Sequence, residues 1–232
     1  HFEARRQRQM CIRDSYKAAI ADNIAPFVDP VFADIGAWDT PSVIAATFAF
    51  GTQIYFDFAG YSLMAIGVAR WFGYFIPKNF NDPYSSPSIA EFWRRWHMSL
   101  SFWLRDYLYI PLGGNRKGPV KTYRNLMITM VLGGLWHGAA WSFVIWGAIH
   151  GAALSVHRFV MGGANGRSLV PALKGVVGIV LTVALVFAAW VPFRAESLSD
   201  TLSVWAGVIG VRDGGPQLSL IHISEPTRPY SI

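Results

Sequence analysis

The chain has 232 residues, of which 53% are hydrophobic, 15% aromatic and only 15% charged, with a formal net charge of +6. A soluble domain carries roughly a quarter charged residues, so this composition indicates a membrane protein and excludes a disordered chain. A single cysteine excludes a disulfide framework, and basic residues placed between long apolar runs favour membrane topology over a nucleic-acid-binding face.

The two ends of the chain match a single DNA element read in opposite orientations. Residues 10–15 (MCIRDS) can be encoded by a sequence whose reverse complement translates as LSLIHI, which is the sequence of residues 218–223. The longer runs RRQRQMCIRDS and LSLIHISEPTR resemble translated adapters from transposon-based sequencing libraries. We therefore expect residues 1–15, with Cys11, and residues 218–232 to be adapter-derived, leaving residues 16–217 as an incomplete native segment.

The first native elements are predicted to be an amphipathic helix and a membrane span. Residues 16–39 mix charged residues with Pro26 and Pro30, which suits a short amphipathic or interfacial helix. Residues 43–68 are predominantly apolar and exceed the roughly 20 residues that cross a hydrocarbon core, so we expect one span there. Asp57 is the one carboxylate in this span, and we expect it to hydrogen-bond a neighbouring helix because a charge there must be paired or neutralised.

Basic and aromatic residues are interleaved along the next part of the chain. Nine lysines or arginines lie from Arg70 to Arg124, which is typical of the cytoplasmic side of a membrane protein. Aromatic residues among them suit the headgroup region, so residues 89–109 are predicted to be helical at the interface and to end before Pro111. Within this region Arg105 and Asp106 are candidates for a local network or for binding a phosphate group, and an interfacial ion pair is more often structural.

Residues 126–156 form an apolar run whose length fits neither one span nor two. Glycines interrupt the run, His137 and His150 lie within it, and basic residues flank both ends. If both flanks are cytoplasmic, the run enters and leaves by one face as a re-entrant or broken pair of helices, which requires protein or a water-filled cavity around its backbone. A single tilted span is the alternative. Residues 175–193 predict a further span, and residues 197–217 begin another weakly apolar helix.

Four histidines lie within residues 16–217: His97, His137, His150 and His157. His137, in GGLWHGAAW, has glycines that permit close approach of a substrate, and an imidazole titrates near neutral pH, as a general base requires. The alternative is a buried histidine that hydrogen-bonds a backbone carbonyl. His97 follows closely on two arginines, which we expect to keep it neutral, and its alternative role is to anchor a helix at the interface. We expect His150 and His157 to be structural, and scattered histidines argue against a zinc site, so no bound metal is expected.

A resemblance to a known family lies in three runs: QIYFDFAGYSLMAIGVARWFGYFIPKNFNDPY, SIAEFWRRWHMSLSFWLRDYLYIPLGGNRKG and NLMITMVLGGLWHGAAWSFVIWGAIHG. They resemble the membrane-bound O-acyltransferase (MBOAT) family, and are most similar to its bacterial alginate O-acetyltransferase branch. The membrane protein of teichoic-acid D-alanylation is related to that branch. The resemblance covers residues 53–151, and its ordered motifs are long enough to be specific.

The resemblance implies an all-α fold, a polytopic membrane helical bundle with broken or re-entrant helices around a catalytic histidine. It assigns the catalytic role to His137, in the WHG motif, and makes His97 the second polar position of the reaction centre. It also implies a set of residues that line the substrate tunnel or support the site: Trp136, Gly138, Arg105, Asp106 and Asn125. A neutral His137 would take the proton from an acceptor hydroxyl as that hydroxyl attacks the acyl carbonyl.

The same resemblance implies the donor, the acceptor and the location. The donor is expected to be a cytoplasmic acyl thioester, acetyl-CoA or an acyl carrier protein, which acts as a substrate rather than as a bound cofactor. The acceptor is expected to be an exported polysaccharide, and a secreted or periplasmic acyltransferase is the expected partner, with membrane lipid around the bundle and no nucleic acid. We expect a multi-pass protein of the bacterial inner membrane, in which further N-terminal spans complete the tunnel, so that residues 16–217 alone are inactive.

Three other functions fit the residues. D-alanyl transfer to teichoic acid shares the motifs and differs in its donor. A haem protein with His137 and either His97 or His150 as axial ligands predicts a Soret band. A transporter fits the glycine-interrupted run at 126–156, because broken helices form substrate sites at the middle of the membrane.

Overall fold

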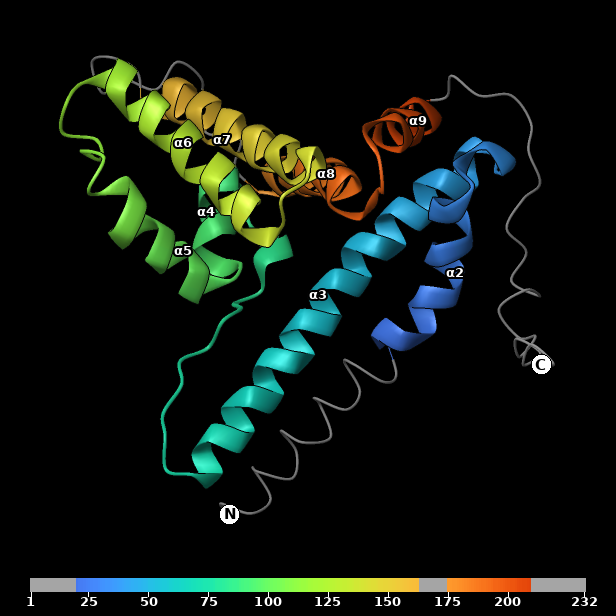
Figure 1. The fold of residues 1–232 in the computed structure, drawn as a ribbon, viewed down its shortest axis with the longest axis horizontal. Helices are drawn as coiled ribbons and strands as arrows, with labels where there is room; N and C mark the ends of the chain where they lie inside the picture. Colours follow the sequence, from blue (N-terminus) through green and yellow to red (C-terminus); the bar gives the residue numbers. More distant parts are fainter. Residues whose placement is uncertain (1–19, 163–174, 210–232) are drawn as a thin grey trace.

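The computed structural model describes residues 20–162 and 175–209, and within these two ranges the chain is helical and contains no strand. The predicted all-α class is therefore confirmed for this part of the chain. Figure 1 shows α2 (Asp22–Ala33) and the long α3 (Thr40–Trp71) on one side, with α9 (Leu198–Val208) near the start of α3. The ends expected to be adapter-derived, 1–15 and 218–232, lie outside the described residues, so that expectation stays a prediction.

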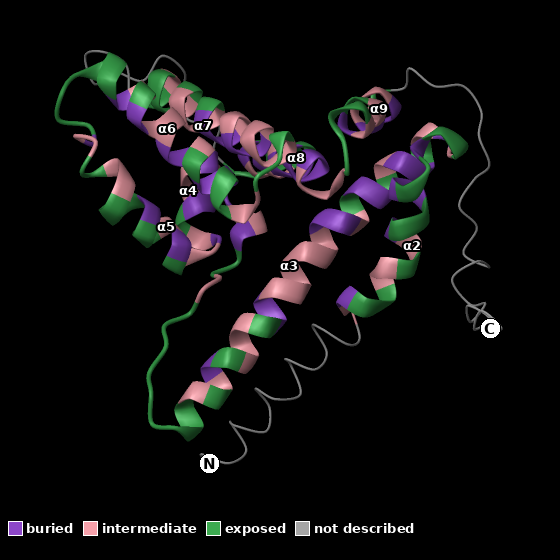
Figure 2. Ribbon diagram, viewed as in Figure 1, coloured by how far each residue is buried: buried purple, intermediate pink, exposed green. Residues whose placement is uncertain are grey.

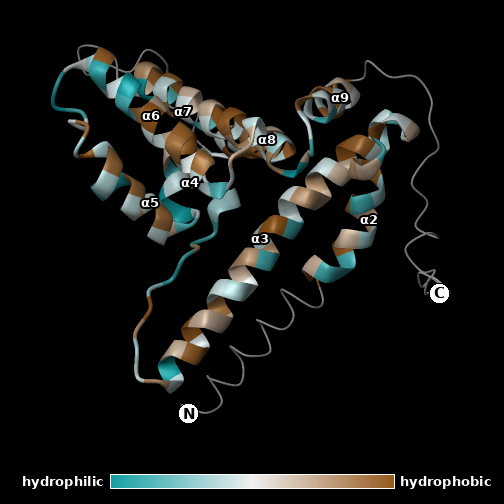
Figure 3. Cartoon of the chain, viewed as in Figure 1, coloured by the Kyte–Doolittle hydropathy of each residue, from teal (hydrophilic) through white to brown (hydrophobic). Residues whose placement is uncertain are grey.

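Helix α3 starts at a defined cap and leaves its second half projecting from the bundle. Asp39 accepts a hydrogen bond from the backbone N–H of Ser42 (3.0 Å), and Pro41 occupies the first turn, where its missing N–H is not needed. The first half packs against α2, α8 and α9, whereas the last turns and the extended segment after them are largely exposed (Figure 2). Many of these exposed residues are apolar, such as Trp71 and Phe75 (Figure 3).

Two described helices are long and apolar enough to cross a membrane, over Trp141–Met161 and Val176–Arg194. The second matches the span predicted at residues 175–193. The predicted span at 43–68 is helical as expected, but it does not reach the same apolarity, because Gln53, Asp57 and several small polar residues dilute its hydropathy. Its crossing of the membrane therefore stays a prediction.

The helical region predicted at residues 89–109 is present but broken. It consists of α4 (Ile89–Arg95), α5 (Met98–Leu104) and a π-helical turn, η4 (Arg105–Tyr109). The break lies at His97, which adopts the left-handed conformation (φ 41°) that non-glycine residues rarely take. The turn therefore sets the direction of the His97 side chain.

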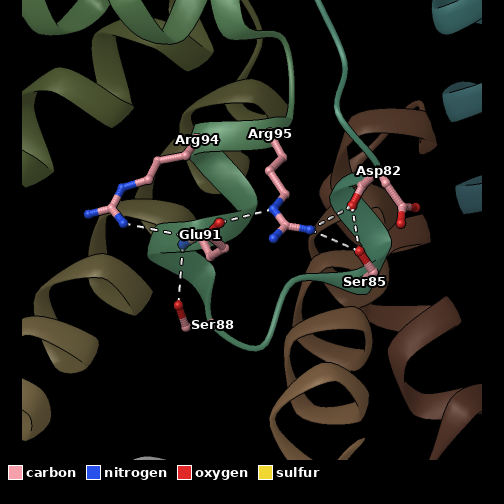
Figure 4. A network of polar contacts seen from close by, with 6 residues as sticks. All are labelled: Asp82, Ser85, Ser88, Glu91, Arg94 and Arg95. Atoms are coloured by element: carbon pink, nitrogen blue, oxygen red, sulfur yellow. Dashed lines mark hydrogen bonds and ion pairs between the residues drawn. The ribbon is translucent and has the colours of Figure 1, made fainter. Parts of the chain in front are cut away.

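A polar network fixes the start of α4 (Figure 4). Ser88 accepts a hydrogen bond from the backbone N–H of Glu91 (3.2 Å), a helix cap, and Glu91 forms ion pairs with Arg94 (3.3 Å) and Arg95 (3.0 Å). Arg95 also donates to the Ser85 hydroxyl (3.0 Å), in the short helix η3 (Pro83–Ser85). The network therefore ties the segment before α4 to the end of α4, next to His97.

The run at 126–156 folds into two helices, α6 (Pro119–His137) and α7 (Trp141–Gly162), which lie side by side (Figure 1). Gly134 meets Phe143 and Gly147 meets Met130, and these pairings run in opposite directions along the two helices, so the pair is antiparallel. The prediction that the run is a broken pair of helices is thus confirmed, and the alternative of a single tilted helix is wrong. The reason is close packing, because glycines in both helices allow the two backbones to touch.

The core between α4, α7 and α8 is rich in aromatic residues. Phe92 and Trp93 of α4, and Trp96 directly after it, pack with Trp146 of α7 and Trp190 of α8 (Val176–Arg194), and all five are buried. Their rings lie 5.0–5.9 Å apart along the series, most of them in tilted or edge-to-face contacts. Such pairs contribute about 0.5–1.5 kcal/mol each beyond the area they bury. The core therefore holds α4, and with it His97, firmly against α7 and α8.

Candidate active site

His97 and His137, which are forty residues apart in the sequence, line the same small cavity of about 40 Å³. The remaining lining residues are apolar or aromatic: Ile54, Phe58, Trp93, Trp96, Leu100, Trp146, Trp190 and Phe193. They come from α3, α4, α5, α7 and α8, so the cavity lies where the main helices meet. A space of this size holds about one water molecule or one substrate atom group.

The imidazole of His97 is oriented by Asn79, which lies in the extended segment after α3. His97 Nδ1 lies 3.2 Å from Asn79 Oδ1, and the same oxygen accepts from the backbone N–H (3.1 Å) and the hydroxyl (2.9 Å) of Ser99. Because a carbonyl oxygen only accepts, Nδ1 carries the proton and Nε2 has the free lone pair. Phe58 packs edge-on against the ring at 4.7 Å. His97 is therefore held as a neutral imidazole with one basic nitrogen.

Burial and, to a lesser degree, the nearby His137 lower the pKa of His97 from 6.5 to about 4. The expectation that His97 stays neutral is supported, but the expected cause is wrong. The arginines that precede His97 are ion-paired with Glu91 rather than directed at the ring. The main cause of the lowered pKa of His97 is therefore desolvation by burial, not the arginines.

His137 is the last residue of α6 and sits among aromatic rings. The ring of Trp146 lies 5.3 Å away and that of Phe193 5.2 Å away, both edge-to-face, and the ring of Trp136 lies 5.0 Å away. The helix ends here because Gly138 is extended (φ 168°), and a side chain at that position would collide with Phe143. Trp136 and Gly138 thus adjoin His137 as expected, although neither lines the cavity.

Three other predicted site residues lie away from this cavity. Arg105 and Asp106 pair with each other (2.7 Å) on the exposed η4. Asn125 is fully buried in α6, where its amide donates to the backbone carbonyls of Leu112 (3.2 Å) and Gly114 (3.0 Å). Asn125 thus ties the loop before α6 to that helix and is not among the residues that line the cavity, and its predicted role at the site stays a prediction.

The two remaining histidines differ in their surroundings. His150 is fully buried and accepts a hydrogen bond from the indole N–H of Trp93 (3.3 Å). His157 lines a second, larger groove of about 620 Å³ between α7 and α8, whose walls are almost entirely apolar. Neither His97 nor His137 borders that groove, so the groove is separate from the candidate site.

Sequence reasoning selected both cavity histidines and missed Asn79 and Ser99. Asn79 lies in the run IPKNFNDPY, whose proline and asparagine residues mark a turn, but its spacing from His97 follows no helical or strand period. The only local signal is the serine two residues after His97. The contact depends on the return of the chain from the end of α3, which a pattern of residues does not specify.

Comparison with known proteins agrees with this architecture. A model of the membrane-bound O-acyltransferase family matches residues 14–187, which is most of the chain. The chain belongs to this family. It is 48% identical to "Probable alginate O-acetylase AlgI" of Azotobacter vinelandii over 197 residues, which are 85% of this chain and 38% of that protein.

The names of two other relatives of this MBOAT chain indicate different acceptors. It is 42% identical to "Peptidoglycan O-acetyltransferase" of Helicobacter pylori, over 92% of this chain and 40% of that protein. It is 36% identical to "Teichoic acid D-alanyltransferase" of Bacillus subtilis, over 48% of this chain and 30% of that protein. The chain thus spans about two fifths or less of the length of these relatives.

Proposed function

We propose that this MBOAT segment carries the reaction centre of a membrane O-acyltransferase that transfers an acetyl group from a cytoplasmic thioester towards hydroxyls of an exported, alginate-type polysaccharide. The observation that supports this most is the meeting of His97 and His137, from two separate motifs, in one aromatic-lined cavity. The 48% identity to an alginate O-acetylase supports the choice of acetyl group and acceptor.

The proposed step uses His137 as the general base. Its neutral imidazole takes the proton of the acceptor hydroxyl, and the hydroxyl oxygen forms a bond to the acyl carbon. The carbon–sulfur bond then breaks, and the thiolate leaves with the proton returned by the imidazolium, so the products are an ester and a thiol. The aromatic walls keep water away and so limit hydrolysis of the thioester.

The roles of His97 and of the other partners complete the proposal. His97, with its basic Nε2, binds or orients the acceptor hydroxyl beside His137. Acetyl-CoA or an acyl carrier protein supplies the acyl group, and a secreted or periplasmic acyltransferase completes the transfer to the polysaccharide. The full-length protein is a multi-pass protein of the bacterial inner membrane, and the tunnel residues Trp136, Gly138, Arg105, Asp106 and Asn125 belong to its substrate path or support it.

Ester analysis separates this function from D-alanyl or peptidoglycan modification. The full-length protein would be produced in an alginate-forming strain and in a teichoic-acid-forming strain, each lacking its own enzyme of this family, and mild alkali would release esters from purified alginate, peptidoglycan and teichoic acid. We expect acetate from alginate. D-alanine from teichoic acid would establish the alternative donor, and absence of any ester despite normal membrane abundance would overturn the acyltransferase proposal.

A further inference from the structure

Two buried polar atoms on one face of α7 have no hydrogen-bond partner among the described residues. They are Nε1 of Trp146 and Nε2 of His150, and the two side chains are 2% and 0% exposed. Leaving a buried polar group unpaired costs about 1–3 kcal/mol, so native proteins keep few such groups. Two of them four residues apart, next to a candidate reaction centre, point to a ligand atom.

Both atoms are hydrogen-bond donors. An indole nitrogen can only donate, so the bond between Trp93 Nε1 and His150 Nδ1 (3.3 Å) makes Nδ1 the acceptor. A neutral imidazole with an unprotonated Nδ1 carries its proton on Nε2. The Trp93 bond therefore fixes the tautomer in which His150 presents an N–H, and Trp146 presents another.

The two donor side chains are adjacent to each other, and Trp146, unlike His150, is also adjacent to the candidate base His137 and lines its cavity. The rings of Trp146 and His150 lie 4.9 Å apart, as expected for residues one helical turn apart, and the ring of Trp146 lies 5.3 Å from that of His137. Trp146 itself lines the cavity that contains His97 and His137. Nε1 of Trp190, on α8, is a third buried donor without a hydrogen-bond partner among the described residues, and it is separate from the two N–H groups on α7.

We propose that the N–H groups of Trp146 and His150 bind the carbonyl oxygen of the acyl thioester and the oxyanion that forms from it. This inference rests on the proposed acyltransferase function. When the acceptor oxygen bonds to the carbonyl carbon, the electron pair of the C=O bond moves to the carbonyl oxygen, which then accepts both hydrogen bonds. When the carbonyl re-forms, the carbon–sulfur bond breaks and the thiolate leaves. Fixed donors at this position stabilise the charge as it develops.

Trp93 is the positioning residue of this arrangement. Its indole N–H holds the His150 ring in place and determines which ring nitrogen carries the proton. Trp93 also lines the cavity, and its ring packs against both His150 (5.1 Å) and Trp146 (5.8 Å). Three aromatic residues from α4 and α7 thus form a rigid donor site that needs no charged residue.

The decisive test removes a single N–H without changing the shape of the side chain. Trp146 of the full-length protein would be replaced by 3-benzothienylalanine, which has sulfur in place of the indole N–H. The matched control is the same replacement at Trp205, whose indole N–H donates to the Ala188 carbonyl (3.1 Å) outside the cavity. Transfer from acetyl-CoA to alginate oligosaccharide would be measured in membranes that contain equal amounts of each variant and are supplied with the secreted or periplasmic acyltransferase that completes the transfer.

We expect kcat to fall about a hundredfold at Trp146, as for loss of one oxyanion donor, with little change in KM, and no change at Trp205. Among variants of equal thermal stability, His150→Gln, which keeps an acceptor for Trp93 and a donor, should retain more activity than His150→Leu. Unchanged kcat with the Trp146 analogue would overturn the donor site and would indicate that the N–H binds only a water. The acyltransferase function would still stand, because the wild type would be active in the same assay. Absence of transfer in the wild type would overturn both.

Discussion

The conformation of His97 depends on residues that lie far from it in the sequence. A left-handed backbone costs a non-glycine residue about 1–3 kcal/mol, and here it turns the imidazole towards Asn79 and the cavity. Strain of this kind persists only where the surrounding contacts determine the conformation. Both histidines could be selected from their motifs, whereas Asn79 could not, because only the tertiary path of the chain brings it to the ring.

Asn79→Ala should disturb the site more than its position in a surface segment suggests. The substitution removes the acceptor for His97 Nδ1 and for Ser99, and we expect a loss of about 1–3 kcal/mol in unfolding free energy and about a tenfold loss of acyl transfer. Asn81→Ala is the control, because Asn81 contributes a backbone N–H to the Arg95 carbonyl, which the substitution keeps. Equal activity of the two variants would contradict the proposed orientation of His97.

The lowered pKa of His97 allows its burial as a neutral imidazole to be tested without an activity assay. An unfolded histidine titrates near 6.5 and His97 in the fold near 4, so between these pH values the unfolded state binds more protons. The contribution of a neutral His97 to stability is therefore complete above pH 6.5 and is lost as the pH falls towards 4. In wild-type protein the thermal midpoint should decline over this range, and His97→Gln should flatten that decline.

A variant of the neighbouring histidine tests whether the two side chains interact. Burial is the main cause of the lowered pKa of His97, and protonation of His137 would lower that pKa further, because the two positive charges would repel each other. His137→Gln should therefore raise the pKa of His97, as measured by NMR of isotope-labelled histidine. An unchanged pKa in this variant would show that the two rings do not share a site.

At the level of elements, the helix pair α6 and α7 depends on glycines where the backbones touch. The sequence showed a glycine-interrupted run of ambiguous length, and only the packing resolves it into two antiparallel helices. The break could be expected near Gly138, but the pairing of Gly134 with Phe143 depends on the register between helices. Local patterns predict which residues are helical, and they do not predict that register.

Neighbouring glycines in α6 provide a matched pair of substitutions. A side chain at Gly134 would collide with the backbone carbonyl of Phe143, which cannot move without separating the helices, so Gly134→Ala should cost about 1–3 kcal/mol. A side chain at Gly133 meets the end of the flexible Leu104 side chain at 3.2 Å, so Gly133→Ala should have a smaller effect. Thermal unfolding of the purified full-length protein measures both, and equal effects would contradict the close contact.

At the level of the whole molecule, the described structure exposes a cluster of large aromatic side chains at one place. Four aromatic residues at the end of α3 and just after it are at least 71% exposed: Trp71, Phe72, Tyr74 and Phe75. Such patches mark contact with membrane or with further protein. The apolar composition of the chain predicted a membrane protein. It could not predict that the end of α3 would project from the bundle, because that depends on which other helices pack against α3.

The direction of the α6–α7 pair in the membrane can be tested with single cysteines. The pair is antiparallel, so Lys117, just before α6, and Arg158, near the end of α7, lie towards the same end. We expect Lys117→Cys and Arg158→Cys in the full-length protein to be labelled from the cytoplasmic side by a membrane-impermeant thiol reagent. Labelling of Arg158→Cys from the periplasmic side would contradict the re-entrant arrangement.

The central claim, that His97 and His137 form one acyl-transfer site, is tested most directly by polysaccharide-bound acetyl ester in cells that produce the full-length protein. Wild type would be compared with His137→Ala, His97→Ala and the control His157→Ala, whose side chain lines the separate groove, at matched membrane abundance. We predict loss of ester with His137→Ala, a strong reduction with His97→Ala and wild-type ester with His157→Ala. Wild-type levels of ester in both cavity variants would contradict a shared acyl-transfer site.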